Sequence, residues 1–505
     1  GRWNYVVDGM VSTGKLSQAQ RDALKFPTTV KAKSVSSALD GPLGLVWRQV
    51  KAELSADGID PASINTKGLR IQTSIDKTAQ ASAQAAITQV YGHLTAKQKN
   101  LRPALAAVNP ATGAVIAYYG GSNGTGLDYV QAWRPPGSSF KPYVTATALT
   151  QNLRGVKPAY TIQSVFDGSS PTTIDGLPFA NDPSDPSNGT YTLLHATTLS
   201  LNTVFGKLTS LVGADNVVKM ARSMGIPDTE SATGPNPGAP TLMRKGHPDD
   251  YVGIGNYPVR ILDQAVGYAT LADGGQFRSS YFIQKVTDAK GNVLYQHKDD
   301  PKRVIDPKVA NDVTLSMEQV APTSGIGLDN GRTAAAKTGT VGIQGTLDSS
   351  DGWTVGFTPQ VSAASWVGSD KVEPIYDANG NSEYGRDLAG HAWQAFMTSY
   401  LGGKPIAPMP TKQEVGLPTP AAVSSSASAS SSSPTPTPTP SSSAPAPSSS
   451  SAAPSSSATP SCTPPSILVG GICVPPPTSS PPPSSASPTG TATAAPASAT
   501  PAPTT

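Results

Sequence analysis

The fold of this chain is decided by residues 135–142, which read PPGSSFKP. Pro142 indicates the start of a helix, because an α-helix tolerates proline only in its first turn, where backbone N–H groups lack partners. The apolar, proline-free residues 143–149 can continue a helix that we expect to begin near Ser138. Lys141 then shares a helix face with Ser138, and an amine beside a hydroxyl can activate a serine without histidine. The structural alternative is a capped helix with a solvated lysine.

Two further short motifs follow in the chain, Ser200-Leu201-Asn202 and Lys337-Thr338-Gly339-Thr340. The patterns S-x-x-K and S-x-N are common, and second copies occur at 74–77 and 63–65. These copies lie in the wrong order and lack a preceding glycine such as Gly137. K-T-G occurs once, on a predicted strand. The three patterns occur together in penicillin-binding proteins and class A β-lactamases.

Over about residues 1–405 the chain resembles the transpeptidase part of class A (bifunctional) penicillin-binding proteins. Segments outside the three motifs carry the resemblance. Residues 2–24 are similar to the family's connector that follows the glycosyltransferase domain, and residues 69–76 to the segment that leads into the first hairpin. Residues 104–121 are similar to that hairpin, and residues 351–368 to the strands that follow K-T-G. The sequence departs from the family at 129–132, where Tyr-Val-Gln-Ala replaces the usual Phe-Asn-Arg-Ala, and at Arg134-Pro135, where Arg-Gln is usual. These departures concern substrate positioning more than the chemistry.

Acyl transfer from an amide requires a nucleophile, a proton acceptor, an oxyanion site and groups that hold the substrate. Ser138 is the expected nucleophile. Lys141 is the expected base, provided that burial and a second cation lower its pKa. Lys337 could be that cation, and its structural alternative is a solubilising lysine at a strand edge.

The remaining motif residues are expected to handle the substrate. Ser200 would relay a proton to the leaving amine, and Asn202 would hydrogen-bond the substrate amide; their structural alternatives are a surface serine and a helix cap. The hydroxyls of Thr338 and Thr340 would bind a terminal carboxylate, which Lys337 also attracts. Gly339 would let substrate approach the strand backbone. The resemblance also implies an oxyanion hole made by the backbone N–H groups of Ser138 and Thr340.

Hydrophobic patterns predict an α+β domain whose antiparallel sheet is closed by distant parts of the chain. The resemblance implies the penicillin-binding protein/serine β-lactamase-like transpeptidase fold, with helices on both sides of the sheet and a helical subdomain. We expect a connector region at 1–67, a transpeptidase domain at 68–405 and a disordered Ser/Pro/Thr/Ala-rich tail at 406–505. Residues 417–505 contain no charged residue, so this stretch buries too little apolar surface to fold.

Composition excludes several classes of protein. The chain has 505 residues, 14% of them charged, and a net charge of +3, which favours neither nucleic acid nor an acidic partner. Cys462 and Cys473 could form one disulfide, and neither they nor the five scattered histidines indicate a metal site or cofactor. The sequence contains no apolar run of about 18 residues, so it predicts no transmembrane helix. Without an initiator methionine or signal pattern, the chain is expected to be a piece of something longer. The resemblance implies that the full-length protein carries a membrane anchor and a glycosyltransferase domain before Gly1, and no glycosyltransferase motif occurs in this sequence.

The three motifs and the resemblance to class A penicillin-binding proteins imply a peptidoglycan D,D-transpeptidase at the extracytoplasmic face of the bacterial envelope. Ser138 would attack the D-Ala–D-Ala bond of one stem peptide, release D-Ala and pass the acyl group to an amine on a neighbouring stem. β-Lactams would acylate Ser138 in place of substrate. Two alternatives remain open at this point: transfer to water, as in a D,D-carboxypeptidase or β-lactamase, and a non-catalytic penicillin-binding sensor or wall tether.

Overall fold

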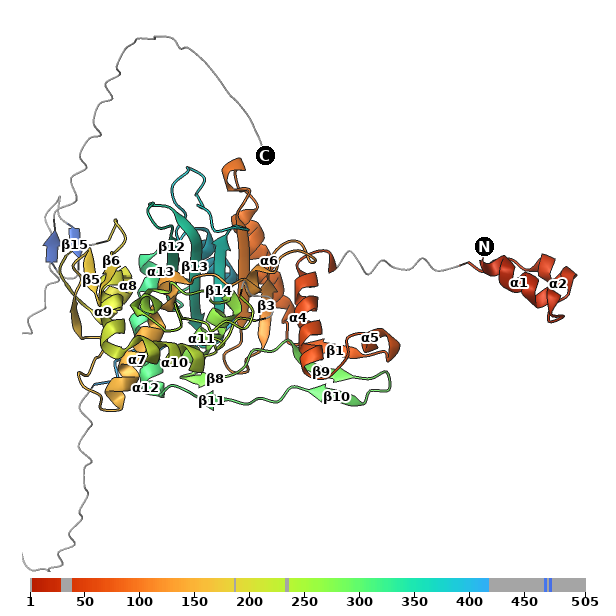
Figure 1. Ribbon diagram of the computed structural model, residues 1–505, viewed down its shortest axis with the longest axis horizontal. Helices are drawn as coiled ribbons and strands as arrows, with labels where there is room; N and C mark the ends of the chain where they lie inside the picture. The colour runs from red at the N-terminus through yellow and green to blue at the C-terminus, as the bar shows by residue number, and fades with distance from the viewer. Residues whose placement is uncertain are drawn as a thin grey trace, which may run out of the picture. The chain divides into compact units, whose positions relative to one another are not determined.

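The computed structural model describes residues 2–28, 39–185, 188–231, 236–416, 467–469 and 472–474. A five-stranded antiparallel sheet with strand order β12-β13-β14-β2-β3 forms its centre (Figure 1). The strands are β2 (Arg102–Val108), β3 (Val115–Tyr119), β12 (Ala335–Gly342), β13 (Ser349–Thr358) and β14 (Val361–Gly368). The pairing of β14 with β2 sets Trp366 opposite Ala104 and joins segments far apart in the sequence. The predicted α+β class and the sheet closed by distant strands are confirmed.

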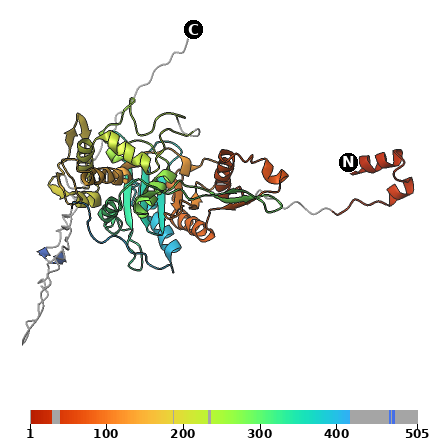
Figure 2. The same cartoon turned by 90° about the horizontal axis from the view of Figure 1, so that it is seen from below.

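Helices cover both faces of this sheet (Figures 1 and 2). They are α11 (Ile261–Ala272) on one face and α6 (Lys77–Tyr91) and α14 (Leu388–Leu401) on the other. Alternate strand residues face opposite sides, so Ala106 packs in the core with Tyr268 of α11, whereas Leu105 packs in the core with Trp393 of α14. The two apolar cores fix the register of the sheet.

A group of helices lies beside the sheet and forms the expected helical subdomain. Its members are α7 (Lys141–Leu153), α8 (Leu193–Leu199), α9 (Asn202–Val212), α10 (Ala214–Ser223) and α12 (Pro307–Met317). The sequence pattern of residues 191–224 predicts one helical region, but the structure divides it at Ser200 and Gly213, which have φ of +64° and +87°. Positive φ interrupts a right-handed helix, so each position starts a new helix axis.

Smaller elements complete the domain. The two-stranded pairs are β4 (Val165–Asp167) with β7 (Thr190–Thr192), β5 (Thr172–Ile174) with β6 (Leu177–Phe179), and β8 (Gln276–Phe277) with β11 (Lys302–Arg303). A three-stranded sheet contains β1 (Arg70–Thr73), β9 (Ile283–Thr287) and β10 (Val293–Gln296), with β9 in the middle. The remaining helices are α4 (Leu43–Ala56) and two short ones, α5 (Ser63–Thr66) and α13 (Val320–Thr323). The apolar patterns at 282–287 and 293–295 predict a hairpin, and the pairing of β9 with β10 confirms it.

The N-terminal residues form α1 (Arg2–Ser12) and α2 (Gln18–Ala23). The sequence Ser17 to Gln20 predicts a capping box, which is confirmed because the Ser17 hydroxyl accepts from the Gln20 N–H and the Gln20 side chain accepts from the Ser17 N–H. Among the described residues beyond 416, β15 (Ile467–Val469) pairs antiparallel with β16 (Ile472–Val474). The rest of the predicted tail beyond residue 416, including Cys462, lies outside the described residues, and the expected domain boundaries stay predictions.

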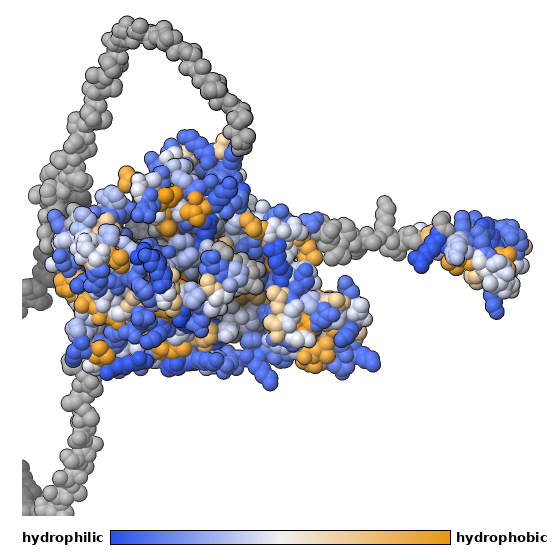
Figure 3. All heavy atoms as spheres, viewed as in Figure 1, coloured by the Kyte–Doolittle hydropathy of each residue, from blue (hydrophilic) through white to orange (hydrophobic). Residues whose placement is uncertain are grey.

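Hydrophilic side chains cover most of the molecular face drawn in Figure 3, with small hydrophobic groups between them. Within the described parts of the chain, every helix is too short or too polar to cross a bilayer.

Candidate active site

Ser138 lies on a 3₁₀ turn, Gly137–Phe140, directly before α7. The sequence predicted an α-helix from Ser138, whereas the α-helix begins at Lys141. Pro142 explains the difference. In an α-helix the N–H of residue 142 would donate to the Ser138 carbonyl, but proline has no N–H. The Lys141 N–H donates to that carbonyl instead, which is the i+3 pattern of a 3₁₀ turn. The expected place of Pro142 in the first helical turn is confirmed.

The Lys141 ammonium nitrogen lies where the first two motifs meet. Its Nζ is 2.8 Å from Ser138 Oγ, 2.8 Å from Asn202 Oδ1, 3.1 Å from Ser200 Oγ and 2.5 Å from the Ser200 carbonyl oxygen. The Lys141 side chain is fully buried, and Ser138 is half-buried. When the amine is neutral, its lone pair can accept the Ser138 proton across the 2.8 Å contact.

Ser200 connects the two lysines. Its hydroxyl accepts from Lys337 Nζ at 2.8 Å and from Lys141 Nζ at 3.1 Å. The residue sits between α8 and α9 with φ +64°, a left-handed conformation that costs a non-glycine residue about 1–3 kcal/mol. This conformation ends α8 and starts α9 two residues later, which brings Ser200 and Asn202 to the same lysine.

Burial changes the protonation of both lysines. It lowers the pKa of Lys141 well below its usual range, and the charge of Lys337 lowers it further, while Asp185 opposes the shift. Burial also lowers the pKa of Lys337 to about 7, again against the effect of Asp185. An amine with a lowered pKa is partly neutral near neutral pH, as a general base must be.

The edge strand β12 contacts the nucleophile turn through backbone atoms. A Cβ on Gly339 would lie 2.3 Å from the Pro136 carbonyl oxygen, and one on Gly137 would lie 2.7 Å from the Thr340 carbonyl oxygen. Gly255 closes the other side of the turn, because its Cβ would lie 2.0 Å from the Gly137 carbonyl oxygen. These glycines let three backbone segments meet around Ser138. Gly339 is expected to let substrate approach the strand backbone, whereas in the structure the segment that lies close to Gly339 is the turn that carries Ser138.

Buried hydrogen bonds from α11 hold the turn that carries Ser138. Gln264 Nε2 donates to Ser139 Oγ at 2.9 Å, and the Tyr268 hydroxyl donates to the Ser139 carbonyl at 2.6 Å. The Tyr143 hydroxyl in turn donates to Gln264 Oε1 at 2.8 Å. Sequence reasoning missed these residues, because a polar side chain inside an apolar helical pattern gives no indication of its partner.

An open cleft of about 210 Å³ leads to Ser138. Its lining includes predicted residues from all three motifs, namely Ser138, Ser200, Asn202, Thr338 and Thr340. Charged or aromatic residues that the sequence analysis missed also line it: Asp182, Asp185, Tyr384 and Arg386. They come from two irregular segments without motif character. The second segment is fixed to the sheet, because the Gly385 N–H donates to Thr340 Oγ1 at 3.1 Å.

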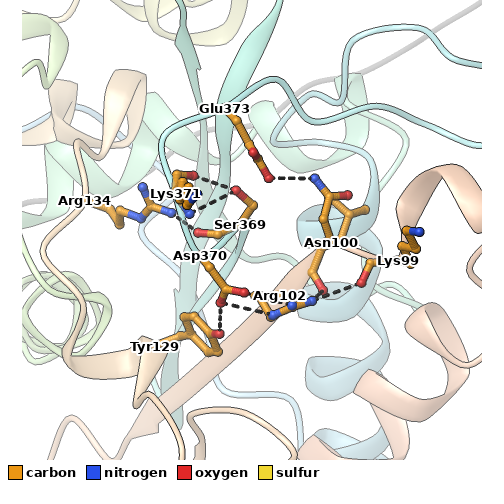
Figure 4. Close-up of polar contacts among 10 residues, drawn as sticks. Lys99, Asn100, Arg102, Tyr129, Arg134, Ser369, Asp370, Lys371 and Glu373 are labelled. Carbon is orange, nitrogen blue, oxygen red and sulfur yellow. Dashed lines mark hydrogen bonds and ion pairs between the residues drawn. The ribbon is translucent and has the colours of Figure 1, made fainter.

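The segment before the nucleophile shows how the sequence accommodates its departures from the family. The Tyr129 hydroxyl donates to Asp370, which also accepts from Arg102 at 2.9 and 3.2 Å (Figure 4). The Tyr129 ring stacks on Trp366 at 5.9 Å between centroids. The bond from Tyr129 holds the pKa of Asp370 below its usual range, while burial raises the pKa of Tyr129 to about 12. The additional hydroxyl at position 129 therefore has a specific partner.

Arg134 fixes the end of that segment. It donates to the Ser369 carbonyl (Figure 4). It also lies 3.4 Å from the buried Asp351 carboxylate and stacks over Trp366 at 5.2 Å. Its backbone also pairs with Val259. The turn that carries Ser138 is thus attached to the sheet four residues upstream. The described residues contain no cluster of three or more potential metal ligands.

Comparison with known proteins gives a consistent result. Residues 104–389 match the family described as "Penicillin binding protein transpeptidase domain". The chain is 38% identical over 424 residues to penicillin-binding protein 1A of Mycolicibacterium smegmatis, covering 82% of this chain and 52% of that protein. It is 37% identical over 428 residues to penicillin-binding protein 1A of Mycobacterium tuberculosis, covering 82% and 50%. The chain therefore spans about half the length of these relatives.

The solved structures agree with this match. The penicillin-binding protein PonA1 of Mycobacterium tuberculosis aligns with a TM-score of 0.68 at 36% identity, over 74% of this chain and 97% of that chain. PonA1 in complex with penicillin V aligns with a TM-score of 0.67 at 36% identity, over 75% and 100%.

Proposed function

Because the chain belongs to the penicillin-binding protein transpeptidase family, with its transpeptidase domain at residues 104–389, we propose that it cross-links peptidoglycan through an acyl-enzyme on Ser138. The family resemblance identified in the sequence and the transpeptidase fold are confirmed. The domain is a serine-type D,D-transpeptidase domain and a β-lactam target. The roles of individual residues, the stem-peptide substrate and the activity of the longer protein are part of the proposal.

One observation carries the assignment of the reacting groups: the buried Lys141 nitrogen lies 2.8 Å from Ser138 Oγ. Ser138 Oγ attacks the carbonyl of the penultimate D-Ala, and its proton passes to neutral Lys141. The backbone N–H groups of Ser138 and Thr340 stabilise the negative charge on the carbonyl oxygen. The C–N bond breaks, and D-Ala leaves with a proton supplied through the Ser200 hydroxyl.

The substrate is held by the other motif residues. Lys337, Thr338 and Thr340 bind the terminal carboxylate, since they offer one cation and two hydroxyls beside the nucleophile. Asn202 bonds the substrate amide; its Nδ2 donates to the Ala180 carbonyl at 2.9 Å, which fixes the orientation of its side chain. An amine from a neighbouring stem then displaces Ser138 from the ester, and the cross-link forms.

A turnover assay separates this function from its rivals. The protein is incubated with a stem pentapeptide ending in D-Ala-D-Ala and with an amine acceptor. We expect release of D-Ala and a covalent product that joins the two peptides. Release of D-Ala with only a hydrolysed tetrapeptide would favour a carboxypeptidase. Stable acylation by penicillin without release of D-Ala would favour a sensor or tether.

We place the protein at the extracytoplasmic face of the bacterial envelope, where peptidoglycan is exposed. Its partners there are stem peptides ending in D-Ala-D-Ala and, as inhibitors, β-lactams. The expected membrane anchor of the full-length protein stays a prediction.

A further inference from the structure

Asp185 contributes a carboxylate to the cleft that contains Ser138. It is half-buried at the end of a tight turn, in which its N–H donates to the Asp182 carbonyl at 2.9 Å. The Asp182 side chain is engaged by this turn, because it accepts from the Ser184 N–H at 3.0 Å and from the Ser184 hydroxyl at 2.7 Å. The turn therefore holds Asp185 in a defined place on the cleft wall.

The cations near Asp185 have other close partners. Lys141 and Lys337 direct their Nζ atoms to Ser138, Ser200, Asn202 and Thr338. Arg386 stacks on Tyr384 at 4.9 Å, and its nearest carboxylate contact is Asp387 at 3.9 Å. Burial and the charge of Asp182 raise the pKa of Asp185, while Lys141, Lys337 and Arg386 oppose this rise electrostatically. Asp185 and Asp182 thus share the cleft with Arg386, and Asp185 lies within electrostatic reach of both lysines.

This charge pattern is a problem for the second half of the proposed reaction. The acyl acceptor is a primary amine, which reaches the site largely as an ammonium at neutral pH. Arg386, and either buried lysine when it is protonated, would repel that ammonium. A carboxylate on the cleft wall offsets the repulsion and gives the ammonium a partner of opposite charge in the cleft that contains Ser138.

We propose that Asp185 is the specificity-determining contact for the acyl acceptor, and that it selects a stem peptide whose side chain ends in a primary amine. This inference rests on the proposed transpeptidation. The bound ammonium gives one proton to solvent water and becomes a neutral, nucleophilic amine. Its nitrogen then attacks the Ser138 ester, the C–N bond forms as the C–Oγ bond breaks, and a second proton passes from nitrogen to Ser138 Oγ. Water carries no charge, so Asp185 favours transfer over hydrolysis.

The test measures how one acyl-enzyme divides between acceptors. A pentapeptide donor acylates the parent protein and the Asp185→Asn variant in the presence of glycinamide, and the ratio of transfer product to hydrolysis product is determined. We expect the Asp185→Asn change to lower this ratio about threefold to tenfold at low ionic strength, with a smaller difference at high salt. Transfer to glycinamide and hydrolysis both consume the same acyl-enzyme at the same pH, so a change in the acylation rate does not alter the ratio of their products.

Two controls make the result specific. Methanol is an uncharged acceptor, and its transfer-to-hydrolysis ratio should be the same in parent and variant. Arg386→Gln removes a charge of the opposite sign from the same cleft, so the glycinamide ratio should stay constant or rise. An unchanged glycinamide ratio in Asp185→Asn, a parallel fall with methanol, or an equal fall in Arg386→Gln would overturn the inference. Failure of the proposed function itself would look different, because the parent protein would then form no transfer product with glycinamide.

Discussion

Replacing Lys141 with methionine is expected to lower the rate of β-lactam acylation by roughly 10²–10⁴-fold, the usual contribution of a general base. The Lys141 side chain is fully buried beside Ser138 Oγ, and a methionine of similar length fills the same space without an amine. The protein should therefore remain folded while Ser138 loses its proton acceptor. Stopped-flow or quenched labelling with a fluorescent penicillin measures the rate, and circular dichroism monitors the fold.

The chain provides a matched control in its second S-x-x-K sequence, Ser74 to Lys77. Lys77 is exposed, and the Ser74 hydroxyl donates to the carbonyls of Val115 and Tyr281 at 2.8 Å each. Lys77→Met should leave acylation unchanged. If Lys141→Met retained acylation within tenfold of the parent, a different group would have to be the base.

Replacing Lys337 with methionine should have opposite effects on activity and stability. Acylation should fall strongly, because the cation for the substrate carboxylate is lost. The free energy of unfolding should rise by about 1–4 kcal/mol at about pH 6, since a buried charge is replaced by an apolar side chain. The same change removes the charge that lowers the pKa of Lys141, so the acidic limb of the acylation profile should move to higher pH.

The stability gain depends on pH in a defined direction. The pKa of Lys337 falls from 10.5 to about 7 on folding. Between these values the unfolded chain binds more protons than the folded one, so stability decreases as pH falls from about 10.5 to about 7 and then levels off. The advantage of Lys337→Met should thus be complete below about pH 7 and small near pH 10.

Thermal unfolding at about pH 6 and about pH 9.5 measures this difference. Lys302 supplies the control. Its side chain is 65% exposed, so Lys302→Met removes a charge that is in contact with solvent in the folded protein. A stability gain of Lys337→Met that is equal at both pH values would contradict the assignment of a buried lysine with a lowered pKa.

Much of this fold could be predicted from the sequence, because its strands have short apolar patterns and its helices have recognisable ends. The capping box at Ser17 occurs as predicted, and Asp76 caps α6, as an aspartate directly before a helical pattern indicates. The structure brings together residues of the three motifs, namely Ser138, Lys141, Ser200, Asn202 and Lys337, while their catalytic roles stay predictions.

Other features could not be derived from sequence patterns. The left-handed conformation of Ser200 depends on tertiary contacts, because a serine has no intrinsic preference for positive φ. The 3₁₀ turn at Ser138 follows from the missing N–H of Pro142, a detail that a helix pattern does not distinguish. Asp185 and Arg386 lie on irregular segments, where neither period nor motif indicates which side chains reach the cleft.

The central claim is that Ser138 is the acylated nucleophile, and one measurement tests it directly. The protein is treated with penicillin V, digested, and the adduct is mapped by mass spectrometry in the parent and in Ser138→Ala. The structure predicts one covalent adduct on the peptide that contains Ser138 and none in the variant. An adduct on another serine, or equal labelling of Ser138→Ala, would contradict the account.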